Sequence, residues 1–245
     1  MIDTHAHLDG LDDPRAALGR AWEQGVEAVA AVAMDAAGGR LALRLAREDQ
    51  RVWPCLGLHP WRVTQETWRQ EVDFVARHLA QAAALGEVGL DYKKKVKKQI
   101  QRAALAAQLD LAAAQGLTAL VHCRFSERRV LAMLKEAGVR AVFHWFAAPE
   151  LLAEVLAAGH FISATPSAAV SPPHRAAIEA CPLERLVLET DTPVAHAGQP
   201  SEPGRVIETC RLVAEIKGLA VPQVAAVTGA NARSLFKLPR PLALL

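Results

Sequence analysis

The chain opens with the stretch MIDTHAH at residues 1–7, in which a short apolar start runs into two histidines one residue apart. Alternate side chains of a β-strand point to the same face, so His5 and His7 can reach one metal ion from the end of a strand. A lone His-x-His motif is weak evidence for a metal site, because chance produces many such pairs. Here, histidines and carboxylates recur after further strand-like runs, and this repetition indicates an enzyme built around metal.

Beyond this start, short apolar runs alternate with longer helical patterns along the whole chain. Strand-like segments lie at residues 1–4, 26–33, 52–56, 85–90, 118–122, 140–143, 160–163 and 186–189. Helical patterns lie at residues 14–24, 39–49, 66–83, 98–115, 126–137, 149–158, 173–180 and 204–217, and a further helix is expected at 222–236.

Eight strand–helix units imply a parallel sheet, and eight is the number of strands that closes into a barrel. We therefore predict an α/β fold, a (β/α)8 TIM barrel, in one domain over residues 1–245. An open doubly wound sheet is the structural alternative. The length of 245 residues agrees with the typical size of such barrels, about 250 residues.

The composition limits the possible classes of protein. A hydrophobic fraction of 51% supports a sizeable core, and a net charge of +2 gives no global field of the kind that DNA coats or polybasic membrane binders carry. Four cysteines stand far apart with no C-x-x-C pair, which is typical of a reduced intracellular protein. No secretory signal and no apolar run of about 20 residues is present. We therefore predict a cytoplasmic protein without membrane association.

Six histidine and carboxylate side chains lie in or directly after five of the predicted strands. They are His5 and His7 after the first strand, Glu87 in the fourth, His122 and His144 at the ends of the fifth and sixth, and Asp191 after the eighth. Because active sites of (β/α)8 barrels lie at the carboxyl ends of the strands, we expect a metal site there. Four imidazoles and two carboxylates suit Zn, Mn, Fe, Ni or Co, and the oxygen ligands leave Mg possible.

Other residues at the same ends are candidates for binding substrate or for orienting a ligand. Arg124 lies two residues beyond His122 and could grip a phosphate, and His59 could touch a phosphate or orient water. Glu189 and Asp9 could each orient a ligating histidine through its second nitrogen. The aromatic residues could stack on bases; they are Trp61, Tyr92, Trp145 and Phe146.

Each of these residues also has a purely structural interpretation. Glu87 could be a buried carboxylate paired with a lysine, and His144 could be a core histidine between two aromatic residues. Arg124 could pair with an acidic neighbour, and the aromatic rings could serve packing alone. The lysine-rich run at residues 93–98 could follow a phosphate backbone, although such runs are usually solvated.

The chain resembles the TatD-like metal-dependent hydrolases, a (β/α)8 branch of the amidohydrolase-type enzymes. The resemblance runs in the expected order over nearly the whole chain and is specific for the family, though not for one substrate. The matching segments are Asp3-Thr4-His5-Ala6-His7-Leu8-Asp9, Gly57-Leu58-His59-Pro60, Gly86-Glu87-Val88-Gly89-Leu90-Asp91-Tyr92, His122-Cys123-Arg124, His144-Trp145-Phe146, Leu188-Glu189-Thr190-Asp191-Thr192-Pro193 and residues 229–236.

The resemblance implies a site with two divalent metal ions, with Zn, Mg or Mn as candidates. His5, His7 and Asp191 would hold the first ion. His122 and His144 would hold the second, and Glu87 would bridge the two. Two cations about 3.5–4 Å apart can clamp a phosphodiester oxygen and activate a water. Asp191 would be the general base that takes a proton from this water, so Asp191 and Glu87 are the predicted catalytic residues.

The resemblance further implies a metal-dependent hydrolase of ester bonds, here a deoxyribonuclease of the 3′–5′ exonuclease type that acts on single-stranded DNA. One alternative is ester or amide hydrolysis, including deacylation of mischarged transfer RNA. Another alternative is a non-catalytic, metal-stabilised subunit of an assembly. The segments Phe146-Ala147-Ala148-Pro149 and Pro200-Ser201-Glu202-Pro203 depart from the family pattern and bear on substrate preference. No partner protein is indicated.

Overall fold

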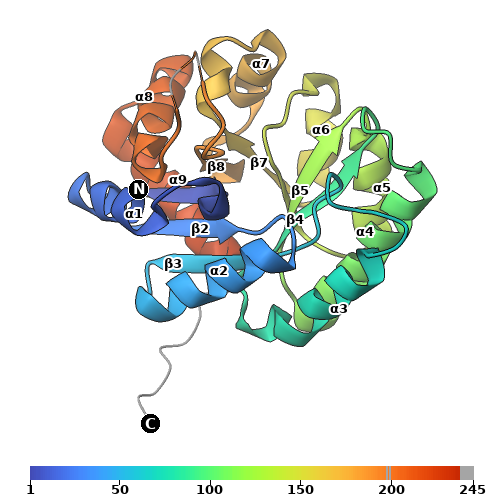
Figure 1. Ribbon diagram of the computed structural model, residues 1–245. Helices are drawn as coiled ribbons and strands as arrows, with labels where there is room; N and C mark the ends of the chain where they lie inside the picture. The colour runs from blue at the N-terminus through green and yellow to red at the C-terminus, as the bar shows by residue number, and fades with distance from the viewer. Residues whose placement is uncertain (197, 199, 238–245) are drawn as a thin grey trace.

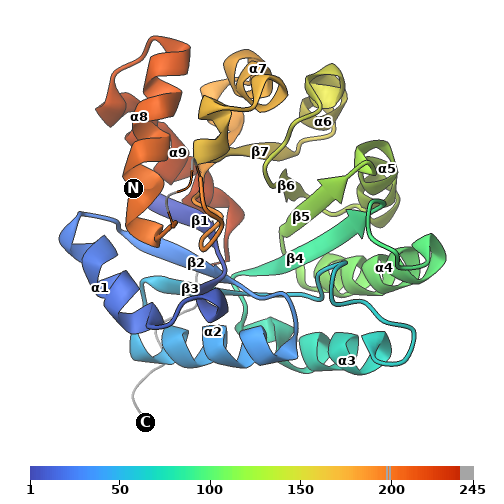
Figure 2. The same ribbon diagram turned by 45° about the horizontal axis from the view of Figure 1, so that its top comes forward.

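The computed structural model describes residues 1–196, 198 and 200–237 and contains a single parallel sheet. Within these residues, eight strands pair in sequence order from β1 to β8 (Figures 1 and 2). The strands are β1 (Ile2–Ala6), β2 (Ala28–Val32), β3 (Val52–Leu56), β4 (Ala84–Asp91), β5 (Ala119–Arg124), β6 (Ala141–Phe143), β7 (Phe161–Ala164) and β8 (Leu186–Leu188). This order confirms the predicted (β/α)8 architecture and excludes a doubly wound sheet, in which the strand order reverses at a switch point.

The two ends of the sheet meet through the loop that follows β8. The backbone N–H of Asp191 donates to the carbonyl of His5 at 3.0 Å, and the N–H of His7 donates to the carbonyl of Thr192 at 2.7 Å. These two hydrogen bonds nearly close the barrel at the carboxyl ends of its strands. They also place Asp191 beside His5 and His7, although almost the whole chain separates them.

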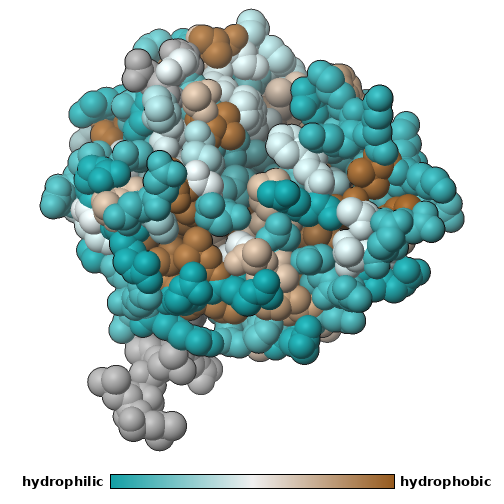
Figure 3. Space-filling view, in the orientation of Figure 1, coloured by the Kyte–Doolittle hydropathy of each residue, from teal (hydrophilic) through white to brown (hydrophobic). Residues whose placement is uncertain are grey.

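The helices lie outside the sheet and surround it (Figure 2). They are α1 (Pro14–Glu23), α2 (Ala36–Glu48), α3 (Trp68–His78), α4 (Lys98–Gln115), α5 (Glu127–Ala137), α6 (Leu152–Ala157), α7 (Pro172–Ala180), α8 (Val206–Lys217) and α9 (Val221–Leu235). The face drawn in the space-filling view of Figure 3 is mostly hydrophilic, with hydrophobic residues in patches. This distribution is expected of helices that turn their apolar faces toward a sheet.

The ends of the helices follow local capping chemistry. The Asp13 side chain accepts a hydrogen bond from the N–H of Ala16 at the start of α1, and Pro14 takes the first helical position. Gly116 ends α4 with a φ of 62°, a left-handed conformation that glycine adopts without steric cost. The helix predicted over 66–83 is shorter in the structure, because the chain leaves α3 at His78 and must be extended at Ala84 to begin β4.

Helix α9 seals the amino-terminal end of the barrel. Asn231 donates from its side chain to the carbonyls of Leu183 and Leu186 just before and within β8, each at 2.8 Å. The Thr118 hydroxyl donates to the carbonyl of Leu235 at 2.8 Å, and Phe236 packs against Trp53. Since this end is covered, the opposite end of the barrel is the one available for substrate.

No single helix among the described residues is long and apolar enough to cross a membrane. One strongly bent pair, Pro203–Lys217 with Val221–Leu235, meets the length and composition requirement only when its two parts are taken together.

A buried histidine at the start of β7 makes the stability of the fold sensitive to acid. His160 is 3% exposed, and its Nδ1 accepts a hydrogen bond from the N–H of Ala141 at 3.2 Å. Burial, with a smaller contribution from the charge of Lys135, lowers the pKa of His160 to about 4. The unfolded chain therefore binds a proton at this residue between about pH 6.5 and 4, whereas the folded chain does not.

We expect the free energy of unfolding to fall as the pH drops through this window, and we expect His160→Asn to weaken that dependence. The asparagine side chain retains an acceptor for the Ala141 N–H but cannot bind the proton. Urea unfolding of both proteins at pH 7 and pH 5 would measure the effect, with His78→Asn, a half-buried histidine at the end of α3, as the control. A pH 7 to pH 5 difference in His160→Asn as large as in the wild type would contradict this assignment.

Candidate metal centre

The six residues predicted to bind metal lie together at the carboxyl ends of the strands. His5 lies on β1, Glu87 on β4 and His122 on β5, whereas the other three follow directly on loops. Five of the six are at most 9% exposed, and His122 is partly exposed; the six are His5, His7, Glu87, His122, His144 and Asp191. Buried ionisable groups at such a density need counter-charges, since an isolated buried charge is very unfavourable.

One group of ligand atoms gathers around one carboxylate oxygen of Glu87. The Nε2 atoms of His5 and His7 lie 3.2 Å apart, and each lies 3.3 Å from Oε2 of Glu87. Oδ1 of Asp191 lies 3.9 Å from Nε2 of His5 and 3.7 Å from Nε2 of His7. Nδ1 of His7 donates to the carbonyl of Val32 at 2.9 Å, which leaves the Nε2 lone pair directed at the group.

A second group faces the other oxygen of Glu87. Oε1 lies 3.2 Å from Nδ1 of His122 and 3.4 Å from Nε2 of His59. His144 lies farther from this oxygen's partners: its ring centroid is 6.5 Å from that of His122, and its Nε2 lies 3.8 Å from the second oxygen of Asp191. The two carboxylate oxygens of Glu87 therefore point at different histidines, which is the geometry that a bridging ligand requires.

The protein atoms fit a pair of cations. Oε1 of Glu87, which faces the second group, is buried and has no hydrogen-bond partner among the described residues. Buried polar atoms without partners are rare and point to a group that binds there. Mixed imidazole and carboxylate ligands are those that Zn and Mn accept. In the ranges that the structure describes, ligand atoms of both kinds lie within 4.8 Å of one another in three groups: His5, His7 and Glu87; His59, Glu87 and His122; and His5, His144 and Glu189.

Electrostatics of the protein alone also favour positive charge at this position. Burial opposes protonation of His7, but Glu87 and Asp191 raise its pKa to about 9. Burial likewise opposes protonation of His144, yet Glu189 and Asp191 raise its pKa to about 10. The carboxylates therefore attract cations, and a metal ion that binds here would replace protons on these rings.

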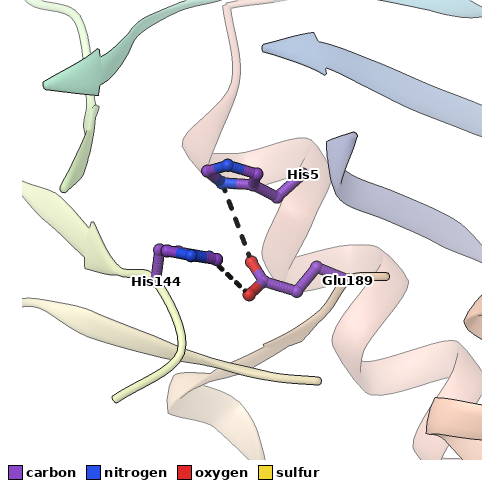
Figure 4. A group of neighbouring side chains, drawn as sticks. All are labelled: His5, His144 and Glu189. Atoms are coloured by element: carbon purple, nitrogen blue, oxygen red, sulfur yellow. Dashed lines mark hydrogen bonds and ion pairs between the residues drawn. The ribbon is translucent and has the colours of Figure 1, made fainter. Parts of the chain in front are cut away.

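Glu189 orients the histidines from the side away from the cluster. Its Oε1 lies 2.7 Å from Nδ1 of His144, and its Oε2 lies 3.9 Å from Nδ1 of His5 (Figure 4). A carboxylate at Nδ1 keeps the proton on that nitrogen, so that Nε2 of His144 faces Asp191. The predicted contact between Glu189 and a histidine of the cluster is therefore present, and its orienting role toward a metal ligand stays a prediction. The same prediction for Asp9 is wrong, because Asp9 is exposed and lies beside Gly38 on α2.

Asp91 has the same role for His122, and sequence reasoning did not identify it. Its Oδ2 accepts a hydrogen bond from Nε1 of Trp61 at 2.6 Å and lies 3.3 Å from Nε2 of His122. His122 thereby presents its other nitrogen to Glu87. A signal was available, because Asp91 lies four residues beyond Glu87 on β4 and so projects to the same face of the strand.

His59 lies inside the cluster rather than at its rim. It is 2% exposed, and its Nδ1 accepts a hydrogen bond from the N–H of Trp61 at 3.1 Å. Burial lowers its pKa to about 4, so the ring is neutral and its one proton lies on Nε2. Although His59 is close enough to Glu87 and His122 to share a metal ion, this proton makes it a hydrogen-bond donor toward the centre.

The other predicted substrate-binding residues surround this centre. Arg124 is exposed at the end of β5. The hydroxyl of Tyr92 accepts a hydrogen bond from Arg102 at 3.0 Å, and Lys98 covers its ring at 4.4 Å. The ring of Trp145 lies 6.2 Å from that of His144.

Strained backbone gathers on the same loops. Among the described residues other than glycine, those with positive φ are Phe125 at 56°, Trp145 at 45° and Asp191 at 55°. They follow or end β5, β6 and β8 at the carboxyl end of the barrel. Such conformations are uncommon and persist where the surrounding structure holds them for function.

Comparison with known proteins agrees with this geometry. The TatD related DNase family matches residues 2–237. The chain belongs to this family. A relative from Mycobacterium tuberculosis, "Uncharacterized metal-dependent hydrolase TatD", is 32% identical over 97% of this chain and 98% of its own length.

Two further similarities concern activity and fold. The "3'-5' ssDNA/RNA exonuclease TatD" of Erwinia tasmaniensis is 35% identical over 89% of this chain and 92% of its own length. The crystal structure of a TatD homologue from Escherichia coli, YJJV, superimposes with a TM-score of 0.90 at 26% identity and covers 98% of both chains. The predicted family and barrel are therefore confirmed.

Proposed function

We propose that this protein is a metal-dependent deoxyribonuclease that removes nucleotides from the 3′ end of single-stranded DNA. The observation that carries the proposal is the position of Glu87, whose two oxygens face separate groups of histidines at the open end of the barrel. Membership in a DNase family supports phosphodiester bonds as the target. A relative named as a 3′–5′ exonuclease of single-stranded DNA and RNA supports the polarity and the single strand.

In this proposal, two divalent ions bind to the six clustered residues, with Zn, Mg or Mn as candidates. His5, His7 and Asp191 would hold one ion, His122 and His144 would hold the other, and Glu87 would contact both. When bound, the ions would supply positive charge that stabilises the phosphate as negative charge develops on it.

The residues of the chain then carry out the remaining steps. Asp191 accepts a proton from the attacking water, while the water oxygen forms a bond to phosphorus and the bond from phosphorus to the 3′ oxygen breaks. The departing 3′ oxygen takes a proton from solvent and leaves as a hydroxyl. Nε2–H of His59 donates a hydrogen bond to a phosphate oxygen. Glu189 and Asp91 keep His144 and His122 in the orientations that the site needs.

Hydrolysis of end-labelled single-stranded DNA tests this function. Metal-stripped protein would be assayed alone and after addition of Mg, Mn, Zn or Co. We expect a ladder of products that shortens from the 3′ end and depends on added metal. If no metal restores cleavage although elemental analysis finds metal bound, the proposal fails, and ester and amide substrates become the next to test.

We also propose that the protein acts in the cytoplasm. All four cysteines are free thiols in the structure, at positions 55, 123, 181 and 210. Unpaired cysteines agree with a reducing compartment. Fractionation of the source cells, followed by immunodetection, would test the location.

Arg124 is the second candidate for a phosphate contact. It lies two residues beyond His122, so the two side chains leave β5 on the same face. We expect Arg124→Ala to raise KM for single-stranded DNA about tenfold and to change kcat much less, because a contact made equally to substrate and transition state affects mainly KM. Steady-state kinetics would measure both constants, with Arg128→Ala on the exposed surface of α5 as the control. A fall in kcat at unchanged KM would instead place Arg124 in the chemical step.

A further inference from the structure

Exposed apolar side chains concentrate around the open end of the barrel. Among the described residues, the exposed large hydrophobic side chains are Trp61, Phe125, Val170 and Val194. They lie on loops after β3, β5, β7 and β8, that is, on the carboxyl end that holds the metal centre. Exposed apolar surface around a site suits a ligand that itself has apolar faces, in addition to a phosphate.

Most aromatic rings near this end are already engaged by the protein. Trp61 donates from Nε1 to Asp91, and the Lys94 ammonium covers its ring at 4.3 Å. Trp145 lies against His144 and against His196, whose ring centroid is 5.8 Å away. Tyr92, covered by Lys98, is occupied in the same way. A base that stacked on any of these rings would have to displace a neighbour.

Phe125 is different. Its side chain is 71% exposed, and within the described part of the chain no aromatic ring or cation contacts its ring. Its φ of 56° is unfavourable for a residue with a side chain, yet the next residue pins the backbone there. The Ser126 hydroxyl accepts a hydrogen bond from the N–H of Arg124 at 3.1 Å and donates to the carbonyl of Leu90 at 2.7 Å. The fold thus fixes the backbone of Phe125 and presents its exposed ring to solvent three residues beyond His122.

Exposed lysines follow the strand end that pairs with the residue before Phe125. Asp91 pairs with Arg124 in the register of β4 and β5, and the N–H of Tyr92 donates to the carbonyl of Arg124 at 3.0 Å. The lysine-rich run at 93–98 therefore starts next to Phe125, and all five of its lysines are exposed. An aromatic ring bordered by flexible cations is the combination that binds single-stranded nucleic acid without reading its sequence.

We propose that Phe125 is a stacking site for one nucleobase of the substrate and that the lysines at 93–98 hold the adjoining phosphates. The substrate strand then leaves the metal centre over the ends of β4 and β5. The inference rests on the proposed nuclease function and adds where the strand lies. It favours a single strand, because both faces of a base inside a duplex are covered by its stacked neighbours.

The test combines a protein variant with abasic substitutions in the DNA. Binding of a fluorescent single-stranded oligonucleotide would be measured by anisotropy with divalent metal present, in the Asp191→Asn background to prevent turnover. We expect Phe125→Ala to weaken binding about tenfold, within the range known for stacking of one base. Val170→Ala, which truncates an equally exposed side chain after β7, is the matched control.

An abasic residue moved along the oligonucleotide then identifies the stacked base. At one position, the abasic residue should weaken binding about tenfold when Phe125 is present. The same abasic residue should not change binding to the Phe125→Ala variant, because the stack is already lost when either the ring or the base is removed. Replacement of the five lysines by glutamine should reduce the slope of log affinity against log salt by about 0.7 for each phosphate that the lysines had neutralised.

The outcomes separate the two proposals. If the wild type cleaves no nucleic acid and Asp191→Asn binds none, the nuclease function fails and the stacking site fails with it. If cleavage occurs but Phe125→Ala binds as tightly as Val170→Ala at every abasic position, only the stacking site is overturned. Because the Phe125 side chain is exposed, its truncation removes no core packing, and a thermal unfolding midpoint equal to that of the control would verify that both variants are folded.

Discussion

Asp191→Asn is expected to lower kcat on single-stranded DNA by about a thousandfold, within the range of roughly 10²–10⁴ that removal of a general base produces. The amide is nearly the same size as the carboxylate and retains one oxygen, which can still face Nε2 of His5 and His7 from about the present 3.9 and 3.7 Å. It cannot accept a proton from the attacking water. Metal content should therefore change far less than turnover.

The structure adds a reason to expect the variant to fold. Burial raises the pKa of Asp191, and the nearby histidines only partly oppose this, so the metal-free fold gains little from its charge. Elemental analysis, steady-state kinetics and thermal unfolding would be run on the same preparation, with Asp12→Asn on the exposed loop before α1 as control. Full activity would refute the base assignment. Loss of metal in parallel with activity would reduce Asp191 to a ligand.

The fold could be predicted because its signals are local and repeated. Apolar runs for the strands recur eight times between helical patterns, and the rule that barrel sites lie at the carboxyl ends then brings distant residues together. His5 and Asp191 illustrate this, since only the closure between β8 and β1 makes them neighbours. Helix limits were less predictable, as α3 shows, because an alanine-rich segment such as residues 79–84 suits several conformations.

The orienting contacts show where sequence reasoning ends. Asp9 and Glu189 looked equivalent as carboxylates close to ligating histidines, but only Glu189 contacts one. The physical reason lies in His7, whose Nδ1 already donates to the backbone carbonyl of Val32. The order of side chains in the sequence does not show that a backbone carbonyl binds His7, nor that Phe125 adopts a left-handed conformation.

Glu87→Ala is expected to reduce the metal content from the proposed two ions per chain to one or none and to abolish turnover. The two oxygens of Glu87 face His5 and His7 on one side and His122 and His59 on the other, so its removal takes a ligand from both groups at once. Burial opposes the charge of Glu87, but the surrounding histidines hold its pKa well below the usual range, and it is therefore a carboxylate ready to bind cations.

The effect can be measured without any assay of activity. A metal ion that binds only the folded chain stabilises it, by about 2.7 kcal/mol when its concentration is a hundred times the dissociation constant. Thermal unfolding with and without added metal should show this gain in the wild type and in Glu66→Ala, which changes an exposed glutamate before α3. In Glu87→Ala the gain should shrink or vanish. If the variant keeps two ions by elemental analysis and the full thermal shift, Glu87 is not a bridge, and the two histidine groups must bind their ions independently of each other.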